Sequence, residues 1–188
     1  ESMDLKISSF RKIAEASPEA VIATNTSSLS VSDLALTVDN DVIGLHFFNP
    51  VPASKLVEIV VADSTPEKLV DEARGWVEAL GKTPIVVKDA PGFASSRLGV
   101  CIALEAIRMV EEGVASPQDI DNAMVLGYKF PVGPLALTDI VGLDVRLGIA
   151  EYLSSTLGDR FAPPQLMRDM VERGELGRKS GKGFYDYS

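Results

Sequence analysis

A histidine and a glutamate in neighbouring apolar segments are the residues whose types could do acid–base chemistry. His46 is the only histidine of the chain and lies near the end of the run at 42–48, just before Asn49. Glu58 lies inside the next run, at 55–61, where a carboxylate is costly unless it is paired. A contact between the two would fix the imidazole tautomer and raise its basicity, as a general base requires. The competing interpretations are a histidine satisfied within the core and an unrelated salt bridge for Glu58.

Side-chain hydroxyls and amides form two further candidate groups. They are Asn25, Thr26, Ser27 and Ser28, directly after a strand predicted at 19–24, and Ser95 and Ser96, where a helix is predicted to begin. Ligands of open α/β sheets bind beyond the carboxyl ends of the strands, so a hydroxyl there can hold a substrate oxygen. Hydroxyls in such positions can equally cap the following helix.

Sequence motifs for phosphates and metals are missing. No G-x-G-x-x-G occurs, and the glycine-rich tail has Leu176 and Gly183 where a P-loop requires its first glycine and its hydroxyl. One histidine and one cysteine cannot build a zinc site, so we expect no metal.

The elements that must position these residues change in character near Pro91. Strands are predicted at 19–24, 42–48, 55–61 and 83–89, alternating with helices at 4–16, 30–36 and 64–81. Helices are predicted after it at 94–112, from Ser116 to about Gly127, at 143–157 and at 164–173, followed by an irregular tail. The fold class is therefore α/β followed by all-α.

Three finer expectations accompany these elements. The middle strands are apolar without alternation, which indicates a sheet covered on both faces. Ser64 or Thr65 is expected to cap the helix at 64–81, and Gly81 is expected to end it. The helix at 94–112 is apolar on nearly every face and is expected to be buried on all sides.

Composition excludes some classes of partner. The net charge is −9, whereas nucleic acids require a basic face, so we expect none. No run approaches the roughly 18 apolar residues of a membrane span, so no membrane association is expected. Cys101, the only cysteine, cannot form an internal disulfide. We expect it to be a small buried hydrophobic residue in a cytoplasmic protein.

Several segments together resemble the 3-hydroxyacyl-CoA dehydrogenase family. They are NTSSL, GLHFFNPVP, KLVEIV, PGF-x-x-x-R, D-x-VGLD and KSGKGFYDY, in the family's order and at similar spacings over essentially the whole chain. The resemblance implies the C-terminal remainder of a Rossmann-type NAD-binding domain over 1–90 and a helical dimerisation and substrate domain over 91–188. It implies a homodimer that oxidises (3S)-3-hydroxyacyl-CoA to 3-oxoacyl-CoA with NAD, in fatty-acid β-oxidation or in 3-hydroxybutyryl-CoA metabolism.

Carried over residue by residue, the resemblance makes His46 the catalytic base and Glu58 the carboxylate that orients it. Ser27 falls on the residue that hydrogen-bonds the substrate oxygen near the nicotinamide. Ser96 stands where the better-known members carry Asn, so its contact with substrate has a shorter reach. Cofactor contacts are expected at Glu1, Lys6, Asn25, Ser27, Asn49 and Lys179.

The glycine fingerprint that holds the pyrophosphate of NAD does not occur in the sequence. We therefore expect these residues alone to bind NAD too weakly for turnover. One alternative is a catalytically incomplete fragment that acts only as a dimerisation module. Another is a different dehydrogenase of β-hydroxyacids, in which catalysis typically uses a lysine, and the His46–Glu58 pair argues against it.

Overall fold

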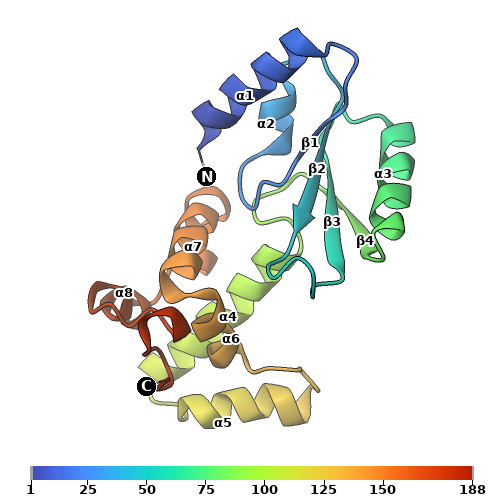
Figure 1. Cartoon of the computed structure of the whole chain (residues 1–188). Coiled ribbons are helices and arrows are strands. Elements are labelled where there is room, and N and C mark those ends of the chain that lie inside the picture. Colours follow the sequence, from blue (N-terminus) through green and yellow to red (C-terminus); the bar gives the residue numbers. More distant parts are fainter. Residues whose placement is uncertain (1, 188) are drawn as a thin grey trace. The chain divides into compact units, whose positions relative to one another are not determined.

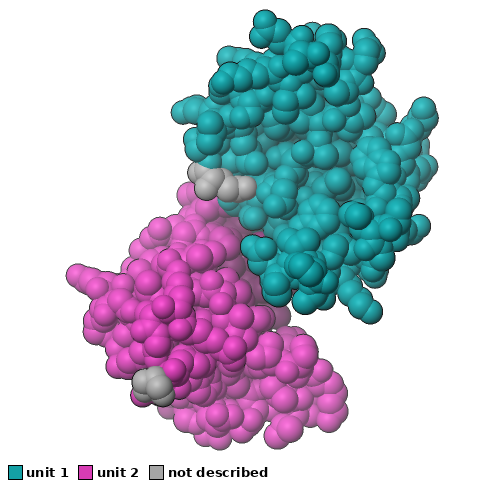
Figure 2. Space-filling view, in the orientation of Figure 1, with its two compact units in different colours: residues 1–94 teal, residues 95–188 magenta. Residues whose placement is uncertain are grey.

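The computed structural model describes residues 2–187. The chain forms two compact units, residues 1–94 and residues 95–188, which are teal and magenta in Figure 2. None of the helices described for residues 2–187 combines the length and the apolar character that a bilayer crossing requires.

Unit 1 is a four-stranded sheet between helices (Figure 1). Its elements are α1 (Met3–Ala16), β1 (Ile22–Thr24), α2 (Val31–Ala35), β2 (Val42–Phe47), β3 (Leu56–Val61), α3 (Glu67–Ala79) and β4 (Thr83–Lys88). The strand order is β1-β2-β3-β4, in which β2 and β3 are antiparallel and the two outer pairs are parallel. The predicted α/β class is therefore confirmed for this unit.

Both faces of the sheet are covered, as the uninterrupted apolar strands predict. On the face of α1 and α2, the core contains Phe10, Ile22, Val31, Leu34, Val42 and Val60. On the face of α3, it contains Ile43, Val57, Ile59, Leu69, Ala73 and Val77. Figure 1 shows α3 alone on its side of the sheet. Because side chains alternate along a strand, His46 and Glu58 share the α1–α2 face with Val60.

Two predicted helix ends differ in outcome. Gly81 follows α3 with φ +70°, the left-handed conformation that ends helices, so that prediction is confirmed. The predicted cap by Ser64 or Thr65 is wrong, because Pro66 occupies the N-cap without a side-chain bond. The Thr65 hydroxyl is engaged elsewhere: it donates to the carbonyl of Val42 at 2.8 Å and accepts from the N–H of Ala62 at 3.1 Å.

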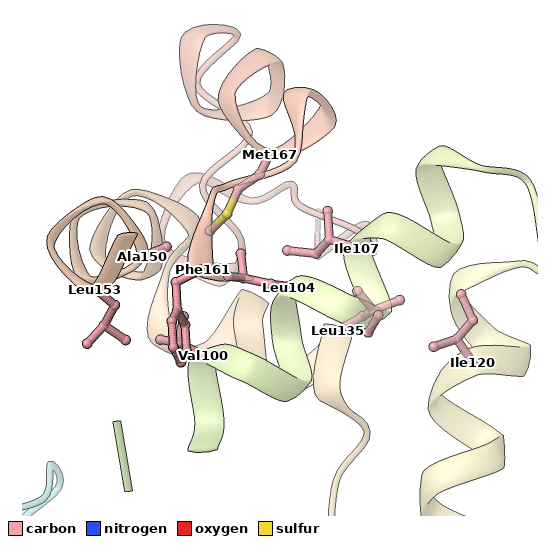
Figure 3. Close-up of a cluster of buried hydrophobic side chains, with 10 residues drawn as sticks. Val100, Leu104, Ile107, Ile120, Leu135, Ala150, Leu153, Phe161 and Met167 are labelled. Atoms are coloured by element: carbon pink, nitrogen blue, oxygen red, sulfur yellow. The ribbon is translucent and has the colours of Figure 1, made fainter. Parts of the chain in front are cut away.

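Unit 2 consists of helices followed by an irregular tail. Its elements are α4 (Ser95–Glu111), α5 (Pro117–Asn122), a π-helical turn η1 (Ala123–Gly127), α6 (Pro134–Val141), α7 (Leu143–Leu157), η2 (Asp159–Phe161), α8 (Gln165–Glu172) and η3 (Arg178–Ser180). Leu104 and Ile107 of α4 lie at the centre of the core, between Leu135, Ala150 and Met167 of the other helices (Figure 3).

Helix α4 corrects two expectations. It buries one stripe, formed by Val100, Ala103, Leu104 and Ile107, and is not buried on all sides, because Leu98 is exposed. This is the i, i+3, i+4, i+7 stripe of an ordinary amphipathic helix. Cys101 is exposed, not buried, since it falls beside that stripe and outside the core.

Helix α6 was not predicted from the sequence, and the C-terminal tail covers it. The buried carboxylate of Asp139 on α6 accepts the backbone N–H groups of Phe184 and Tyr185, each at 3.0 Å. Asp121 accepts the N–H groups of Leu135 and Ala136, in the first turn of α6, at 2.8 and 2.9 Å. Two buried acids therefore hold the tail and the helix together.

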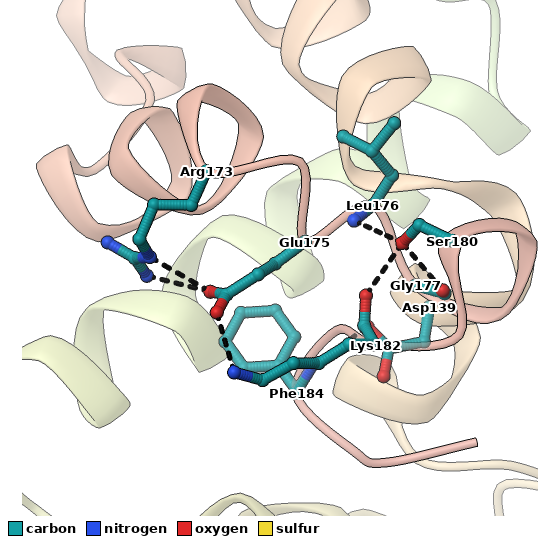
Figure 4. Close-up of polar contacts among 8 residues, drawn as sticks. All are labelled: Asp139, Arg173, Glu175, Leu176, Gly177, Ser180, Lys182 and Phe184. Atoms are coloured by element: carbon teal, nitrogen blue, oxygen red, sulfur yellow. Dashed lines mark hydrogen bonds and ion pairs between the residues drawn. The ribbon is translucent and has the colours of Figure 1, made fainter. Parts of the chain in front are cut away.

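Side chains within the tail complete this arrangement (Figure 4). The Ser180 hydroxyl accepts from the N–H of Leu176 at 2.8 Å and donates to the carbonyl of Lys182 at 2.9 Å. Glu175 pairs with Arg173 at 2.8 Å and with Lys182 at 2.7 Å. The tail is thus irregular, as predicted, yet well bonded.

Candidate active site

The buried pair of His46 and Glu58 is the centre of the candidate site. The two residues face each other across β2 and β3 as register partners. His46 Nδ1 lies 2.8 Å from Glu58 Oε2, with 5% of His46 and none of Glu58 exposed to solvent. The contact predicted from the sequence is therefore present. A carboxylate at Nδ1 favours the tautomer that carries its proton there, which leaves Nε2 as a proton acceptor.

Backbone and rings fix this pair. Glu58 Oε1 accepts the backbone N–H of Ala94 at 3.1 Å, so both carboxylate oxygens are bonded. The rings of Phe48 and Phe93 lie 4.5 and 5.6 Å from the imidazole, centroid to centroid. Phe93 has φ +48°, an uncommon conformation for a residue with a side chain, and follows Gly92 at +75°. The PGF turn therefore presents a ring to the histidine and an N–H to the glutamate.

The carboxyl ends of β1 and β2 bring further predicted residues to the same sheet edge. The two strands are parallel, and Asn25 Oδ1 accepts the N–H of Phe47 at 2.9 Å. Lys6 reaches this edge from α1, with Nζ 3.3 Å from the hydroxyl of Thr24. Among residues 2–187, no partner is found for the Asn25 amide nitrogen, which leaves its donors available.

The hydroxyl segment after β1 does not serve as the helix cap. The cap of α2 is Ser30, whose hydroxyl accepts from Asp33 N at 3.0 Å. Thr26 is buried and accepts the N–H of Leu29 at 2.9 Å, which closes a turn. Ser27, within this turn, is exposed. Asn49 is also exposed and lies three residues beyond His46 in the printed sequence.

Comparisons with known proteins identify both halves of the chain. Residues 1–90 match the NAD binding domain of 3-hydroxyacyl-CoA dehydrogenase, and residues 92–187 match its C-terminal domain. The chain belongs to the 3-hydroxyacyl-CoA dehydrogenase family.

Individual relatives agree with this assignment. The chain is 44% identical to a probable 3-hydroxybutyryl-CoA dehydrogenase of Bacillus subtilis, over all of the chain and 67% of the relative. It is 40% identical to the mitochondrial hydroxyacyl-coenzyme A dehydrogenase of Sus scrofa, over all of the chain and 61% of the relative. The crystal structure of an (S)-3-hydroxybutyryl-CoA dehydrogenase from Ralstonia eutropha is similar, with a TM-score of 0.94 and 41% identity over all of this chain and 68% of that one.

As a member of the 3-hydroxyacyl-CoA dehydrogenase family, the chain is that of an NAD-dependent dehydrogenase. The residues gathered at the edge of β1 and β2 are polar groups of the kind that can hold part of NAD. They offer the Asn25 amide, the Lys6 ammonium and exposed Asn49, all polar and on the side of the sheet where such folds bind nucleotides. None of them is a glycine-rich turn for the pyrophosphate.

Two predicted residues, Ser96 and Lys179, belong to unit 2, so their roles stay predictions. Lys179 is engaged there, with Nζ 2.6 Å from Asp144 Oδ2, so a cofactor would compete with this ion pair. Glu1 lies outside the described residues.

Sequence reasoning missed the two phenylalanines that flank the imidazole of the dehydrogenase. Both lie in motifs that carried the family resemblance, HFFNP and PGF, but a motif letter does not show which side chain faces His46. Only the left-handed turn at residues 92 and 93 brings the second ring into place.

Proposed function

We propose that this dehydrogenase oxidises (3S)-3-hydroxyacyl-CoA thioesters to 3-oxoacyl-CoA, with His46 as general base and Glu58 as the carboxylate that orients it. The observation that carries the proposal is the buried 2.8 Å contact between His46 Nδ1 and Glu58 Oε2. A lone buried imidazole would resist protonation, whereas one paired with a carboxylate can accept a proton without leaving an uncompensated charge.

The reaction divides between proton and hydride. His46 Nε2 accepts the proton of the substrate's C3 hydroxyl while the C3–H bond breaks and the C3=O bond forms. Bound NAD supplies the acceptor for the hydride. Glu58 then faces an imidazolium across their hydrogen bond. The negative charge of the carboxylate stabilises the positive charge that develops on the histidine.

Polar residues near this pair receive supporting roles. We assign the C3 oxygen to the hydroxyl of Ser27, with a second bond from Ser96. We assign cofactor contacts to Lys6, Asn25 and Asn49, and also to Glu1, Ser27 and Lys179. The positions of Lys6 and Asn25 at the carboxyl edge of β1 support this assignment.

The two halves of the chain receive separate tasks in this proposal. NAD binding is assigned to residues 1–90, and dimerisation to residues 91–188. An apolar cavity of about 320 Å³ beside α4 supports the second assignment, because Ile102, Met109, Ile120 and Met124 line it within one unit. Exposed Leu98 and Leu126 add apolar surface that a second copy would cover. Sedimentation of the enzyme at micromolar concentration should give a dimer.

Stereospecific turnover tests the reaction. The complete enzyme, supplied with NAD, should reduce the cofactor with (3S)-3-hydroxybutyryl-CoA and not with the (3R) isomer. Free 3-hydroxybutyrate at the same concentration should give no comparable rate, since remote binding of the CoA part orients C3. Equal rates with the thioester and the free acid would overturn the proposal.

A further inference from the structure

Arg146 on α7 is a buried charge for which the proposed reaction has no use. Only 7% of the residue is exposed. Its Nε atom is fully buried without a hydrogen bond, and among residues 2–187 the guanidinium forms no ion pair. Burial lowers the pKa of this group to about 10. A buried cation without a partner is costly, so the position calls for an anion that the chain itself does not supply.

A small cavity lies against this guanidinium, entirely within unit 2. Its volume is about 140 Å³, and it is lined by Arg146, Gly99, Ile102, Phe130, Val132 and Leu137. Apart from Arg146, these walls offer no charged or polar side chain. The cavity therefore combines apolar walls with a single cation.

Gly99 keeps the space before the guanidinium open. It lies inside α4, where glycine costs roughly 0.5–1 kcal/mol relative to alanine. A Cβ atom at this position would lie 3.4 Å from Arg146 Nη1, so any longer side chain would enter the space beside the cation. The glycine of α4 and the buried arginine of α7 therefore line the same cavity.

The size and charge of the cavity select the ligand. A cavity of about 150 Å³ holds a benzene molecule, so this one accepts about six heavy atoms. The adenosine and phosphates of CoA are far too large. A guanidinium presents a planar fork that matches a carboxylate through two parallel hydrogen bonds. A short aliphatic chain that ends in a carboxylate matches both the walls and the cation.

Ser96 connects this cavity with the proposed reaction. It precedes Gly99 by one helical turn, so both residues lie on the same face of α4. The rise between them is about 4.5 Å, which an extended zigzag chain of roughly three to four C–C bonds, each ~1.5 Å long, spans. If Ser96 holds the C3 oxygen, a chain that continues from C3 by a few carbons reaches Arg146.

We propose that Arg146 binds the terminal carboxylate of ω-carboxyacyl-CoA substrates and so determines acyl-chain specificity. This inference rests on the proposed function, because it assumes a 3-hydroxyacyl-CoA substrate held near Ser96. It goes further by naming the chemical class of the acyl chain: a 3-hydroxy thioester of a dicarboxylic acid of about six carbons.

A pair of matched substrates tests the proposal in the complete enzyme. The first is the CoA thioester of 3-hydroxyadipic acid, with its free carboxylate, and the second is 3-hydroxyhexanoyl-CoA. The wild type should prefer the first in kcat/KM. Arg146→Met, which keeps the length without the charge, should lower the ratio of the two kcat/KM values by about 10- to 100-fold, as expected for loss of a charged hydrogen bond. Arg168→Met, which removes an exposed arginine of the same unit, should leave the ratio unchanged.

A binding measurement separates this site from turnover. Adipate should raise the melting temperature of the wild type more than hexanoate does, and Arg146→Met should abolish the difference. Turnover of 3-hydroxyhexanoyl-CoA without any preference for the carboxylate would overturn this inference and leave the proposed function standing. Inactivity toward both thioesters would overturn both. Dissociation of the dimer in Arg146→Met would assign the guanidinium to a second copy and also overturn the inference.

Discussion

His46 and Glu58 are register partners on antiparallel strands, so their side chains leave the sheet on the same face, directly opposite each other. The 2.8 Å contact between them joins two residues of the sheet itself, and the Ala94 N–H holds the other oxygen of Glu58. The contact is set by the pairing of β2 with β3, and a shift of one residue in that pairing would turn one side chain to the other face.

Replacement of the histidine should abolish proton transfer and leave binding intact. We expect His46→Ala to lower kcat with a 3-hydroxyacyl-CoA by about 10²–10⁴-fold, the usual contribution of a general base, with little change in KM. Steady-state kinetics of the complete enzyme would check this. A variant that retains more than half of the wild-type kcat would show that the base is another residue.

Replacement of the glutamate should act through the histidine. Glu58→Gln keeps the shape of the side chain but removes the charge that stabilises the imidazolium. We therefore expect Glu58→Gln to lower kcat with a 3-hydroxyacyl-CoA and to leave KM little changed, which steady-state kinetics would measure. Glu175→Gln, an acid of the tail, is the control and should change neither constant. An unchanged kcat in Glu58→Gln would refute the dyad.

The tail glycines should be intolerant of a side chain. A Cβ atom on Gly183 would overlap Asp139 Oδ1, and the Asp139 carboxylate cannot move away cheaply, because each of its oxygens accepts a backbone N–H group. We expect Gly183→Ala to lower the free energy of unfolding by about 1–3 kcal/mol. Gly148→Ala is the matched control, because this helical glycine has open space around it and should gain roughly 0.5–1 kcal/mol. Chemical unfolding of the three proteins would compare them, and equal losses would be contrary to expectation.

The unpaired arginine should cost stability at every pH below its own titration. The pKa of Arg146 is lowered by burial to about 10 from 12.5, so the folded state disfavours the charged form. The penalty is complete below pH 10 and is relieved as pH rises from there. We expect Arg146→Met to raise the free energy of unfolding by about 1–3 kcal/mol, equally at pH 7 and pH 9. Urea unfolding at the two pH values would test this, and a loss of stability would reveal a partner for the guanidinium.

Features with a local signal were predictable from the sequence. Uninterrupted apolar residues predict the strands at 42–48 and 55–61. A glutamate buried in such a strand is costly without a partner, so a partner was expected. Because a short turn joins the two segments, the lone histidine was within reach. The helix at 143–157 was likewise predicted with the bounds that the structure has.

Features that depend on distant partners were not predictable. Helix α6 is only eight residues long and is capped by Asp121, which lies in another helix. The glycines of the tail do not form a phosphate loop. Gly177 and Gly183 instead lie so close to Asp139 that a side chain would not fit there. Burial of single residues was also not predictable. Cys101 is exposed although its neighbours along the chain are apolar, and Arg146 is buried although it is charged.

The second oxygen of Glu58 links the site to the backbone at the boundary between the two units of the chain. It accepts the N–H of Ala94, the last residue of unit 1, and the next peptide begins α4 of unit 2. The Glu58 carboxylate thus contacts both the imidazole of His46 and the backbone at the end of unit 1. The N–H of Ala94 takes up part of the carboxylate charge, so a backbone conformation at residue 94 that broke this bond would leave more of the charge to the imidazole and strengthen it as a base.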